Sequence, residues 1–410
     1  MKVNLLALFF WILFGSVTPA ATLVVTNVFD SGAGTLRQAV ADASAGDNII
    51  FSSTLSSQVI FITNGSIAIT KNITIDGTAL SGQIRLDGGQ TNSIFTIGAS
   101  KFSSCTVILN SLIITNGFSA SYGGGGINVN QSSVLTMNNC AIVNNTAPVG
   151  GGGILNSGVL TMNGCAVANN FATAGSSGGG IFMLGITSLT DSTVANNSSY
   201  DGGGILCYAG LGALTLNNST VANNTATHRG GGILNMGSVL KLTNTIVSMN
   251  NNSDIVGGMG AGVGNMISAS NINLAPLGNY GGPTPTMPPL FGSPAIDAGV
   301  DTVTNSYIYD QRGYPRLSGT HVDVGAVEVF AATNSPKLTG LEQLETGFFQ
   351  LNFTNVSGAS FSVWISTNVA LPFNQWSNIG YPTEIASGYY QFVDQQAASN
   401  MQSFYRVSSP

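Results

Sequence analysis

A run of three glycines followed by isoleucine occurs five times between residues 123 and 253, and this repeat restricts the fold more than any other feature. The successive isoleucines are 27, 27, 24 and 28 residues apart. A period of this length is typical of arrays of stacked units, each of which buries its apolar face only against its neighbours. The repeat therefore predicts a solenoid. The five isoleucines are Ile127, Ile154, Ile181, Ile205 and Ile233.

Within each repeat, apolar and polar residues alternate as expected for short strands with one buried face. We predict inward positions for Leu135/Met137, Leu160/Met162, Leu214/Leu216 and Leu240/Leu242, and outward positions for Thr136, Thr161, Thr215 and Lys241. The next strand is predicted to place inward Ile142, Val167, Val194, Val221 and Ile246. Two residues further on, side chains that stack from coil to coil and satisfy the turn backbone are predicted at Asn144, Asn169, Asn196, Asn223 and Ser248.

These patterns predict an all-β fold, a right-handed parallel β-helix over residues 22–275 with about nine coils. A β-propeller is disfavoured because its blades repeat at roughly 40–50 residues. Thr35 and Gln38 form a capping box that opens a short amphipathic helix, which is placed to cover the first coil. Residues 276–333 follow as a capping segment. Residues 334–410 contain aromatic, alternating strands without glycine runs and predict a small antiparallel β-sandwich.

Composition and the N-terminus indicate an exported protein with a neutral polar surface. Only 7% of the 410 residues are charged, and the net charge is −6, which argues against nucleic acid as a partner. Residues 1–21 resemble a signal peptide, with Lys2, an apolar run over 5–14 and Thr-Pro-Ala at 18–20. No later segment is long and apolar enough to cross a bilayer. We expect a monomer that is secreted or lies on a bacterial cell surface.

Two groups of motifs resemble known families. The Gly-Gly-Gly-Ile and Ala-Asn-Asn coils resemble secreted parallel β-helix proteins with repeats like those of polymorphic outer membrane proteins. Four further motifs, together with the opening over residues 31–51, resemble the choice-of-anchor Q family over roughly residues 22–330, which implies an exported, surface-associated β-helix without an established activity. The tail over 404–410 resembles C-terminal domains of secreted verrucomicrobial proteins. The four motifs are Leu-Ala-Pro-Leu-Gly-Asn-Tyr-Gly-Gly-Pro-Thr-Pro-Thr-Met at 274–287, Gly-Ser-Pro-Ala-Ile-Asp-Ala-Gly at 292–299, Asp-Gln-Arg-Gly-Tyr-Pro at 310–315 and Val-Asp-Val-Gly-Ala-Val-Glu at 322–328.

One group of ionisable residues in the repeats is a candidate catalytic cluster. Asp201 and Arg229 each precede a glycine triplet, so they should occupy the same turn on adjacent coils, with His228 beside Tyr200. A polysaccharide lyase needs a base and a cation, whereas a glycosidase needs two carboxylates at a set separation. The alternative, which we favour, is an inter-coil ion pair without catalytic function.

Acidic residues gather instead in the capping segment. Asp297, Asp310 and Asp323 are candidate ligands for calcium, which binds several oxygen atoms. The alternative is a capping loop that Arg312 and backbone hydrogen bonds hold in place, and we favour it because no compact ligand spacing is visible. We therefore expect no cofactor, with calcium as the exception to test.

The four cysteines all lie in the repeat region. Cys140 and Cys165 occupy the same position on adjacent coils, near enough for a bond, but their side chains would point in parallel and strain a disulfide. We predict that the cysteines act as small buried hydrophobic residues. The four are Cys105, Cys140, Cys165 and Cys207.

A row of apolar residues is predicted to point outward from consecutive coils. If the repeat isoleucines point inward, the residue after each must point outward. Such a row is either a binding surface or is covered by the capping segment folded back along the solenoid. The row consists of Leu155, Phe182, Leu206 and Leu234.

The favoured hypothesis is a secreted or cell-surface protein for adhesion or for recognition of polysaccharide or protein. The first alternative is a polysaccharide lyase or glycoside hydrolase that uses Asp201, His228 and Arg229. The second alternative is a purely structural component of the cell envelope.

Overall fold

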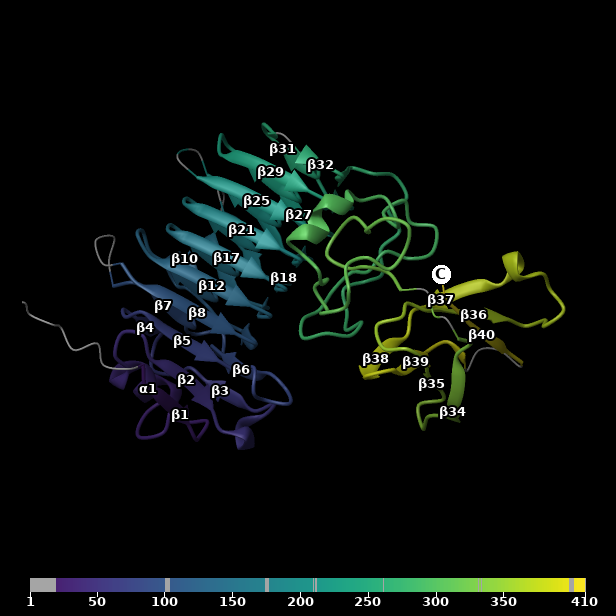
Figure 1. The fold of residues 1–410 in the computed structure, drawn as a ribbon, viewed down its shortest axis with the longest axis horizontal. Coiled ribbons are helices and arrows are strands. Elements are labelled where there is room, and N and C mark those ends of the chain that lie inside the picture. The colour runs from purple at the N-terminus through teal and green to yellow at the C-terminus, as the bar shows by residue number, and fades with distance from the viewer. Residues whose placement is uncertain are drawn as a thin grey trace, which may run out of the picture.

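In the computed structural model, the chain forms a parallel β-solenoid of about 8 turns followed by a small antiparallel β domain (Figure 1). The structure describes residues 20–409, with the exception of 100–103, 174–176, 209, 211, 261, 331, 333 and 398–401. The predicted signal peptide lies outside the described residues, apart from its last two positions. The predicted fold class is confirmed, and the number of turns is close to the about nine that the period indicates.

Three parallel sheets form the walls of the solenoid, and each coil except those at the two ends contributes one short strand to each sheet. The ten-stranded sheet consists, in spatial order, of β1 (Thr22–Val25), β2 (Asn48–Phe51), β5 (Ile73–Asp76), β8 (Thr106–Asn110), β12 (Val134–Asn138), β17 (Val159–Asn163), β21 (Ile186–Thr190), β25 (Ala213–Asn217), β29 (Val239–Thr243) and β32 (Gly262–Val263). The nine-stranded sheet consists of β3 (Val59–Phe61), β6 (Ile84–Asp87), β9 (Leu112–Thr115), β13 (Ala141–Val143), β18 (Ala166–Ala168), β22 (Thr193–Ala195), β26 (Thr220–Ala222), β30 (Ile246–Ser248) and β33 (Met266–Ile267).

The third wall and two small lateral sheets complete the coils. The eight-stranded sheet consists of β4 (Ile67–Ile69), β7 (Phe95–Ile97), β11 (Ile127–Val129), β16 (Ile154–Asn156), β20 (Ile181–Met183), β24 (Ile205–Cys207), β28 (Ile233–Asn235) and β31 (Ile255–Val256). Between the nine-stranded and eight-stranded walls lie β14 (Thr146–Ala147), β19 (Phe171–Ala172), β23 (Ser198–Asp201) and β27 (Thr225–Arg229), and also β10 (Tyr122–Gly124) and β15 (Val149–Gly151).

The N-terminal end of the stack is covered by helix α1 (Leu36–Asp42), as predicted. Thr35 caps it, because its side-chain oxygen accepts a hydrogen bond from the Gln38 N–H at 3.2 Å. Leu36, Ala39 and Val40 are its buried face and belong to the solenoid core. A 3-10 helix, η1 (Ser53–Leu55), follows β2. No helix among the described residues has the length and apolar character needed to cross a lipid bilayer.

The predicted inward positions of the first repeat strand are confirmed. Leu135 pairs with Leu160, and Leu214 pairs with Leu240, and all four are buried. In the second strand the alignment is wrong by one residue at its last member, because Val221 pairs with Val247 and not with Ile246. Both residues are apolar, so sequence alone did not distinguish them. Ile246 points away from the solenoid core and is buried against the capping segment.

The predicted asparagine ladder exists, but it is formed by the second asparagine of each pair. The first asparagines, for example Asn196 at φ 57°, adopt the left-handed backbone conformation that this residue type tolerates. The second asparagines are buried, and each side-chain amide donates to the next side-chain carbonyl at 2.9 Å. Asn250 ends the ladder by donating to Asp254 at 2.8 Å. The ladder members are Asn145, Asn170, Asn197, Asn224 and Asn250.

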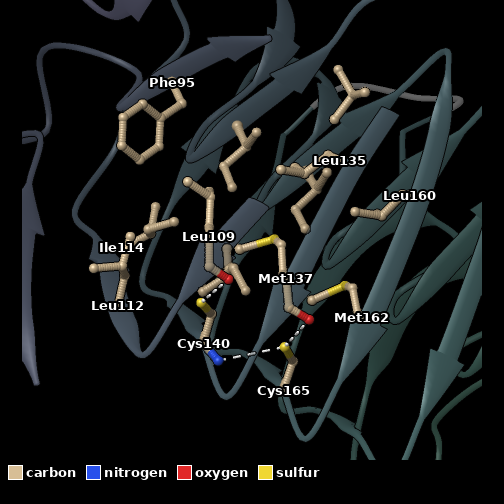
Figure 2. Close-up of a cluster of buried hydrophobic side chains, with 14 of the residues drawn as sticks. Phe95, Leu109, Leu112, Ile114, Leu135, Met137, Cys140, Leu160, Met162 and Cys165 are labelled. Carbon is tan, nitrogen blue, oxygen red and sulfur yellow. Dashed lines mark hydrogen bonds between the residues drawn. The ribbon is translucent and has the colours of Figure 1, made fainter. Parts of the chain in front are cut away.

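A second ladder contains two of the cysteines, at the turn between the ten-stranded and nine-stranded walls (Figure 2). The Cys140 N–H donates to the Cys165 sulfur at 3.4 Å, and the Cys165 N–H donates to the Ser192 hydroxyl at 3.1 Å. The Cys165 thiol donates to the Met137 carbonyl at 3.4 Å. All four cysteines are buried and free, and burial raises the pKa of the Cys140 thiol. The two ladder cysteines therefore act as hydrogen-bonding residues and not only as small hydrophobic ones.

This ladder predicts different results for two substitutions of Cys165. Cys165→Ser retains a donor and an acceptor, so we expect little change in stability. Cys165→Val removes both and leaves the buried Cys140 N–H unpaired, which should lower the free energy of unfolding by about 1–3 kcal/mol. Chemical denaturation of both variants is the measurement. Equal stability of the two variants would show that the ladder bond to sulfur contributes nothing.

The capping segment, residues 276–333, packs against the outer face of the nine-stranded sheet. Its Met287, Ala295 and Val324 form an apolar cluster with outward residues of that sheet, including Ala222 and Ile246. The segment contains one short 3-10 helix, η2 (Asp301–Asn305). Figure 1 shows this green segment beside the C-terminal half of the stack.

The C-terminal domain consists of two antiparallel sheets that share a small aromatic core. Phe353, Phe361 and Tyr390 pack with ring centroids 4.8–5.2 Å apart. The first sheet contains β34 (Lys337–Gln343), β35 (Phe349–Thr354), β39 (Tyr389–Asp394) and β38 (Thr383–Ala386), and the second contains β37 (Ser377–Gly380), β36 (Ser362–Ser366) and β40 (Phe404–Ser408), with η3 (Phe373–Gln375) preceding β37.

Candidate functional site

The structure brings together the three residues of the candidate catalytic cluster. Asp201 lies on β23 and pairs with Arg229 on the adjacent strand β27, after an irregularity in strand register. The Asp201 carboxylate contacts the His228 Nδ1 at 2.9 Å and the Arg229 Nε at 3.2 Å. The ring of Tyr200 stacks on His228 with centroids 5.0 Å apart. The predicted juxtaposition of these four side chains is therefore confirmed.

The chemistry of this cluster is limited by its single carboxylate. The Asp201 side chain is 5% exposed, whereas His228 and Arg229 are 50% and 44% exposed. A buried carboxylate that orients an imidazole beside a guanidinium supplies a base and a cation, as a lyase requires. Among the described residues of the repeats, the other two carboxylates are engaged elsewhere and form no glycosidase pair with Asp201, because Asp191 pairs with Arg316 and Asp254 accepts hydrogen bonds from Asn250.

The ion pair itself should contribute little to stability. We expect Arg229→Ala to lower the free energy of unfolding by at most about 1 kcal/mol, because the guanidinium is largely hydrated. Chemical denaturation measures this change, and Arg229→Lys is the matched control that retains the charge. A loss far above this value would show that the pair holds β23 and β27 together.

The predicted apolar row is present but is not exposed. Leu155, Phe182, Leu206 and Leu234 form one cluster on the outer face of the eight-stranded sheet and are at most 6% exposed. The rings of Tyr122 and Tyr208 pack against Phe182 at centroid distances of 6.1 and 5.8 Å, and Leu184, Met236 and Val256 pack against the same cluster. The row therefore presents no free surface to a partner.

The glycine triplets explain why this row is covered by its own repeats. A Cβ atom at Gly124 would lie 2.6 Å from the backbone nitrogen of Leu155, and one at Gly178 would lie 2.9 Å from that of Phe182. Glycine thus lets each lateral segment pass directly over the eight-stranded sheet. The alternative prediction, that the capping segment covers the row, is corrected as well, since that segment packs on the nine-stranded sheet.

The calcium candidates in the capping segment are already engaged by protein donors. Asp310 accepts hydrogen bonds from the backbone of Arg312, Tyr314 and Glu328 and from the Arg312 Nε, at 2.9–3.1 Å. Asp323 accepts from the Asp297 N–H at 2.8 Å. Further bonds run from the Val329 N–H to Asp323 and from the His321 N–H to Asp297. Within the described ranges, no three His, Cys, Asp or Glu residues form a group able to hold a metal ion.

The capping segment also buries two acids with raised pKa values. Burial, with the Asp323 carboxylate nearby, raises the pKa of Glu328 to about 8, and burial raises the pKa of Asp323 to about 6. In the solenoid, burial raises the pKa of Asp191 to about 6, against the favourable charge of Arg316. All three carboxyl groups therefore bind protons more strongly in the folded protein than in the unfolded chain.

This difference predicts a stability that falls with rising pH. A carboxyl group with a raised folded pKa gives the folded state more bound protons than the unfolded state, so the free energy of unfolding decreases as pH rises. The pH range of this decrease extends from the ordinary carboxyl pKa values of 3.8 and 4.5 up to the folded-state pKa of about 8 for Glu328. We expect a loss of at least about 1 kcal/mol across it in chemical denaturation. Glu328→Gln should reduce the dependence of the free energy of unfolding on pH in the upper part of this range. An unchanged dependence would contradict a raised pKa of Glu328.

The outer face of the ten-stranded sheet is a fourth candidate site, which was not predicted from the sequence. Its outward residues form three rows along the stack, one apolar, one of hydroxyl groups and one mostly of amides. Ile186 is 49% exposed, and the hydroxyl row is partly exposed. From β12 to β25 the rows are Val134, Val159, Ile186 and Ala213; Thr136, Thr161, Ser188 and Thr215; and Asn138, Asn163, Thr190 and Asn217.

This bare face carries no charge between Asp76 on β5 and Lys241 on β29. The capping segment reaches its amide row at Asn217, which donates to the Tyr307 hydroxyl at 3.4 Å. In the described part of the chain, the side-chain hydroxyls of the four-member hydroxyl row make no hydrogen bond to the protein. The recurring Val-Leu-Thr-Met-Asn at residues 134–138 and 159–163 was the sequence signal for this surface.

No protein-family model, curated protein or solved structure matches the chain. The fold and the four candidate sites therefore provide the basis for a functional proposal.

Proposed function

We propose that this protein is exported and attaches to, or recognises, a polysaccharide or a protein outside the cell, through the bare face of the ten-stranded sheet. The single observation behind this proposal is that other segments of the chain pack on the outer faces of the other two walls over part of their length, whereas the ten-stranded wall stays open from β12 to β25. An open, uncharged face with free hydroxyl groups suits neutral partners. We further propose membership of the choice-of-anchor Q family and a location outside the cell or on its surface.

The bare face favours a binding role over a purely structural one. A structural envelope component would also be rigid and repetitive, but it would not need a row of unpaired hydroxyl groups on an open wall. The buried apolar row cannot serve as the binding surface without local opening of the lateral strands. A monomer is sufficient, because the proposed surface lies entirely on one chain.

A polysaccharide lyase is the second candidate function, and the geometry of Asp201, His228 and Arg229 is the observation in its favour. In this hypothesis His228 acts as base and Arg229 neutralises the substrate carboxylate next to the reacting carbon. Activity that is lost in both His228→Ala and Arg229→Ala, with the fold intact, would establish it.

The test is a panel of soluble and insoluble polysaccharides and envelope proteins, incubated with purified residues 22–410. Two signals are measured together, retention of the protein and release of unsaturated or reducing ends. We expect retention without new ends, and the same retention with EDTA, since binding needs no calcium in this proposal. New ends would favour the lyase, and neither signal would favour the structural alternative.

A further inference from the structure

The bare face presents three rows of similar chemical groups on four consecutive coils, from β12 to β25. Parallel strands stack about 4.8 Å apart, so each row places like groups at that interval along the solenoid axis. Thr136 pairs with Thr161, Ser188 follows Thr161, and Thr215 follows Ser188 in the same register. A hydroxyl group is therefore presented on four consecutive coils, flanked on one side by apolar side chains and on the other mainly by amides.

The amide row and the strand backbone are held in position before any ligand arrives. The side-chain amide of Asn163 donates to the side-chain oxygen of Asn138 at 2.9 Å, and the side-chain amide of Asn138 donates to the side-chain oxygen of Asn110 at 2.9 Å. The strands themselves are fixed by parallel pairing on both sides. Because little side-chain or backbone freedom remains to be lost on binding, weak contacts can add up along the face.

The face lacks the features by which proteins usually hold a single soluble sugar chain. Its outward positions from β8 to β29 include no aromatic residue on which a sugar ring could stack. A flat sheet contacts a ligand from one side only, so each contact is weak. Repeated weak contacts become strong only when the ligand repeats as well and is itself rigid.

We infer that the bare face binds the ordered surface of an insoluble, neutral polysaccharide, with the hydroxyl row as the specificity-determining element. This inference rests on the proposed binding function and names its ligand class. Apolar side chains such as Val159 and Ile186 contact the C–H faces of the sugar rings, while the hydroxyl and amide rows exchange hydrogen bonds with sugar hydroxyls. Lys241 interrupts the hydroxyl row and marks one end of the surface.

The test uses purified residues 22–410 with microcrystalline cellulose and crystalline chitin, and with cellohexaose and chitohexaose as soluble counterparts. The triple variant Thr136→Val, Thr161→Val and Thr215→Val removes three hydroxyl groups but retains branched side chains suited to strands. Its control, with serine at the same three positions, retains the hydroxyls. We expect wild type and the serine variant to bind one of the solids and the valine variant to bind it roughly tenfold or more weakly. Thermal unfolding verifies that all three are folded.

The outcomes separate this inference from the broader proposal. Equal retention of the valine variant would overturn the role of the hydroxyl row. If the protein binds the hexasaccharides as tightly as the solids, or binds only an envelope protein, the inference of an ordered polysaccharide ligand is wrong. The proposed recognition function would still stand. A wild-type protein that binds nothing in either panel would contradict both. Inhibition of ice growth without retention on polysaccharide would also overturn the inference, because ice is an ordered lattice of water molecules and presents no C–H groups.

Discussion

Replacement of Arg316 by alanine should lower the free energy of unfolding by about 3–5 kcal/mol, the largest effect that we expect from a single substitution. The Arg316 side chain is completely buried, and its Nη2 lies 2.6 Å from the Asp191 carboxylate. The guanidinium also donates to the carbonyl of Gly325 at 2.8 Å and to that of Ala326 at 3.1 Å. It thereby joins the capping segment to the solenoid.

The loss of stability in Arg316→Ala arises mainly from the buried polar groups that the substitution leaves without a partner. Without Arg316, the Asp191 carboxylate remains 85% buried without its cation, and two backbone carbonyls lose their donors. The raised pKa of Asp191 reduces this loss at low pH, because a protonated carboxyl group needs no counter-charge. The loss should therefore be smaller at pH 5 than at pH 8.

Chemical denaturation of Arg316→Ala, Asp191→Asn and the double variant Arg316→Met/Asp191→Asn measures the effect. Removing both charges should restore a large part of the stability that Arg316→Ala loses, since no unpaired charge remains. Limited proteolysis should cut the capping segment of Arg316→Ala faster than that of the wild type. If all variants unfold at the same denaturant concentration, the guanidinium does not join the two parts.

The solenoid could be predicted from sequence because its repeat imposes the same local solution on every coil. Once Ile127 and Ile154 are recognised as equivalent, alternation fixes the neighbouring inward positions, and the pairing of Leu135 with Leu160 follows. The cap at Thr35 was predictable for a similar reason, because its hydrogen bond is local. Features determined within one coil were therefore accessible without a structure.

Errors of one residue arose where two adjacent residues were chemically alike. Both members of Asn196–Asn197 can adopt a left-handed turn and both can form a ladder, so the pattern does not tell which one is buried. The same holds for Ile246 and Val247, because the capping segment buries the outward residue as well. Alternation of polarity disappears wherever a second layer covers a sheet.

The candidate sites followed the same division between local and distant contacts. Asp201 and Arg229 were predictable neighbours because both precede a glycine triplet. Arg316 was not singled out, since its partner Asp191 is 125 residues away in the sequence. The bare face could not be assigned a role from sequence, because its openness depends on where the capping segment and the lateral strands pack.

Replacement of Asn197 by alanine should lower the free energy of unfolding by about 2–4 kcal/mol. The side-chain oxygen of Asn197, Oδ1, accepts hydrogen bonds from both the backbone N–H and the side-chain amide of Asn170, at 3.0 and 2.9 Å. Its own amide donates to the Val167 carbonyl and to Asn224, each at 2.9 Å. Alanine would leave two buried donors of Asn170 without an acceptor.

The adjacent residue provides a matched control. Asn196 is exposed and has a φ of 57°, so Asn196→Gly retains the backbone conformation and should change stability by less than about 0.5 kcal/mol. Chemical denaturation of the two variants compares neighbouring asparagines of which only one belongs to the ladder. A similar cost at both positions would mean that the turn conformation, and not the ladder, stabilises the stack. A large cost at Asn197 alone would establish the ladder as the element that aligns successive coils, and with them the rows of the bare face.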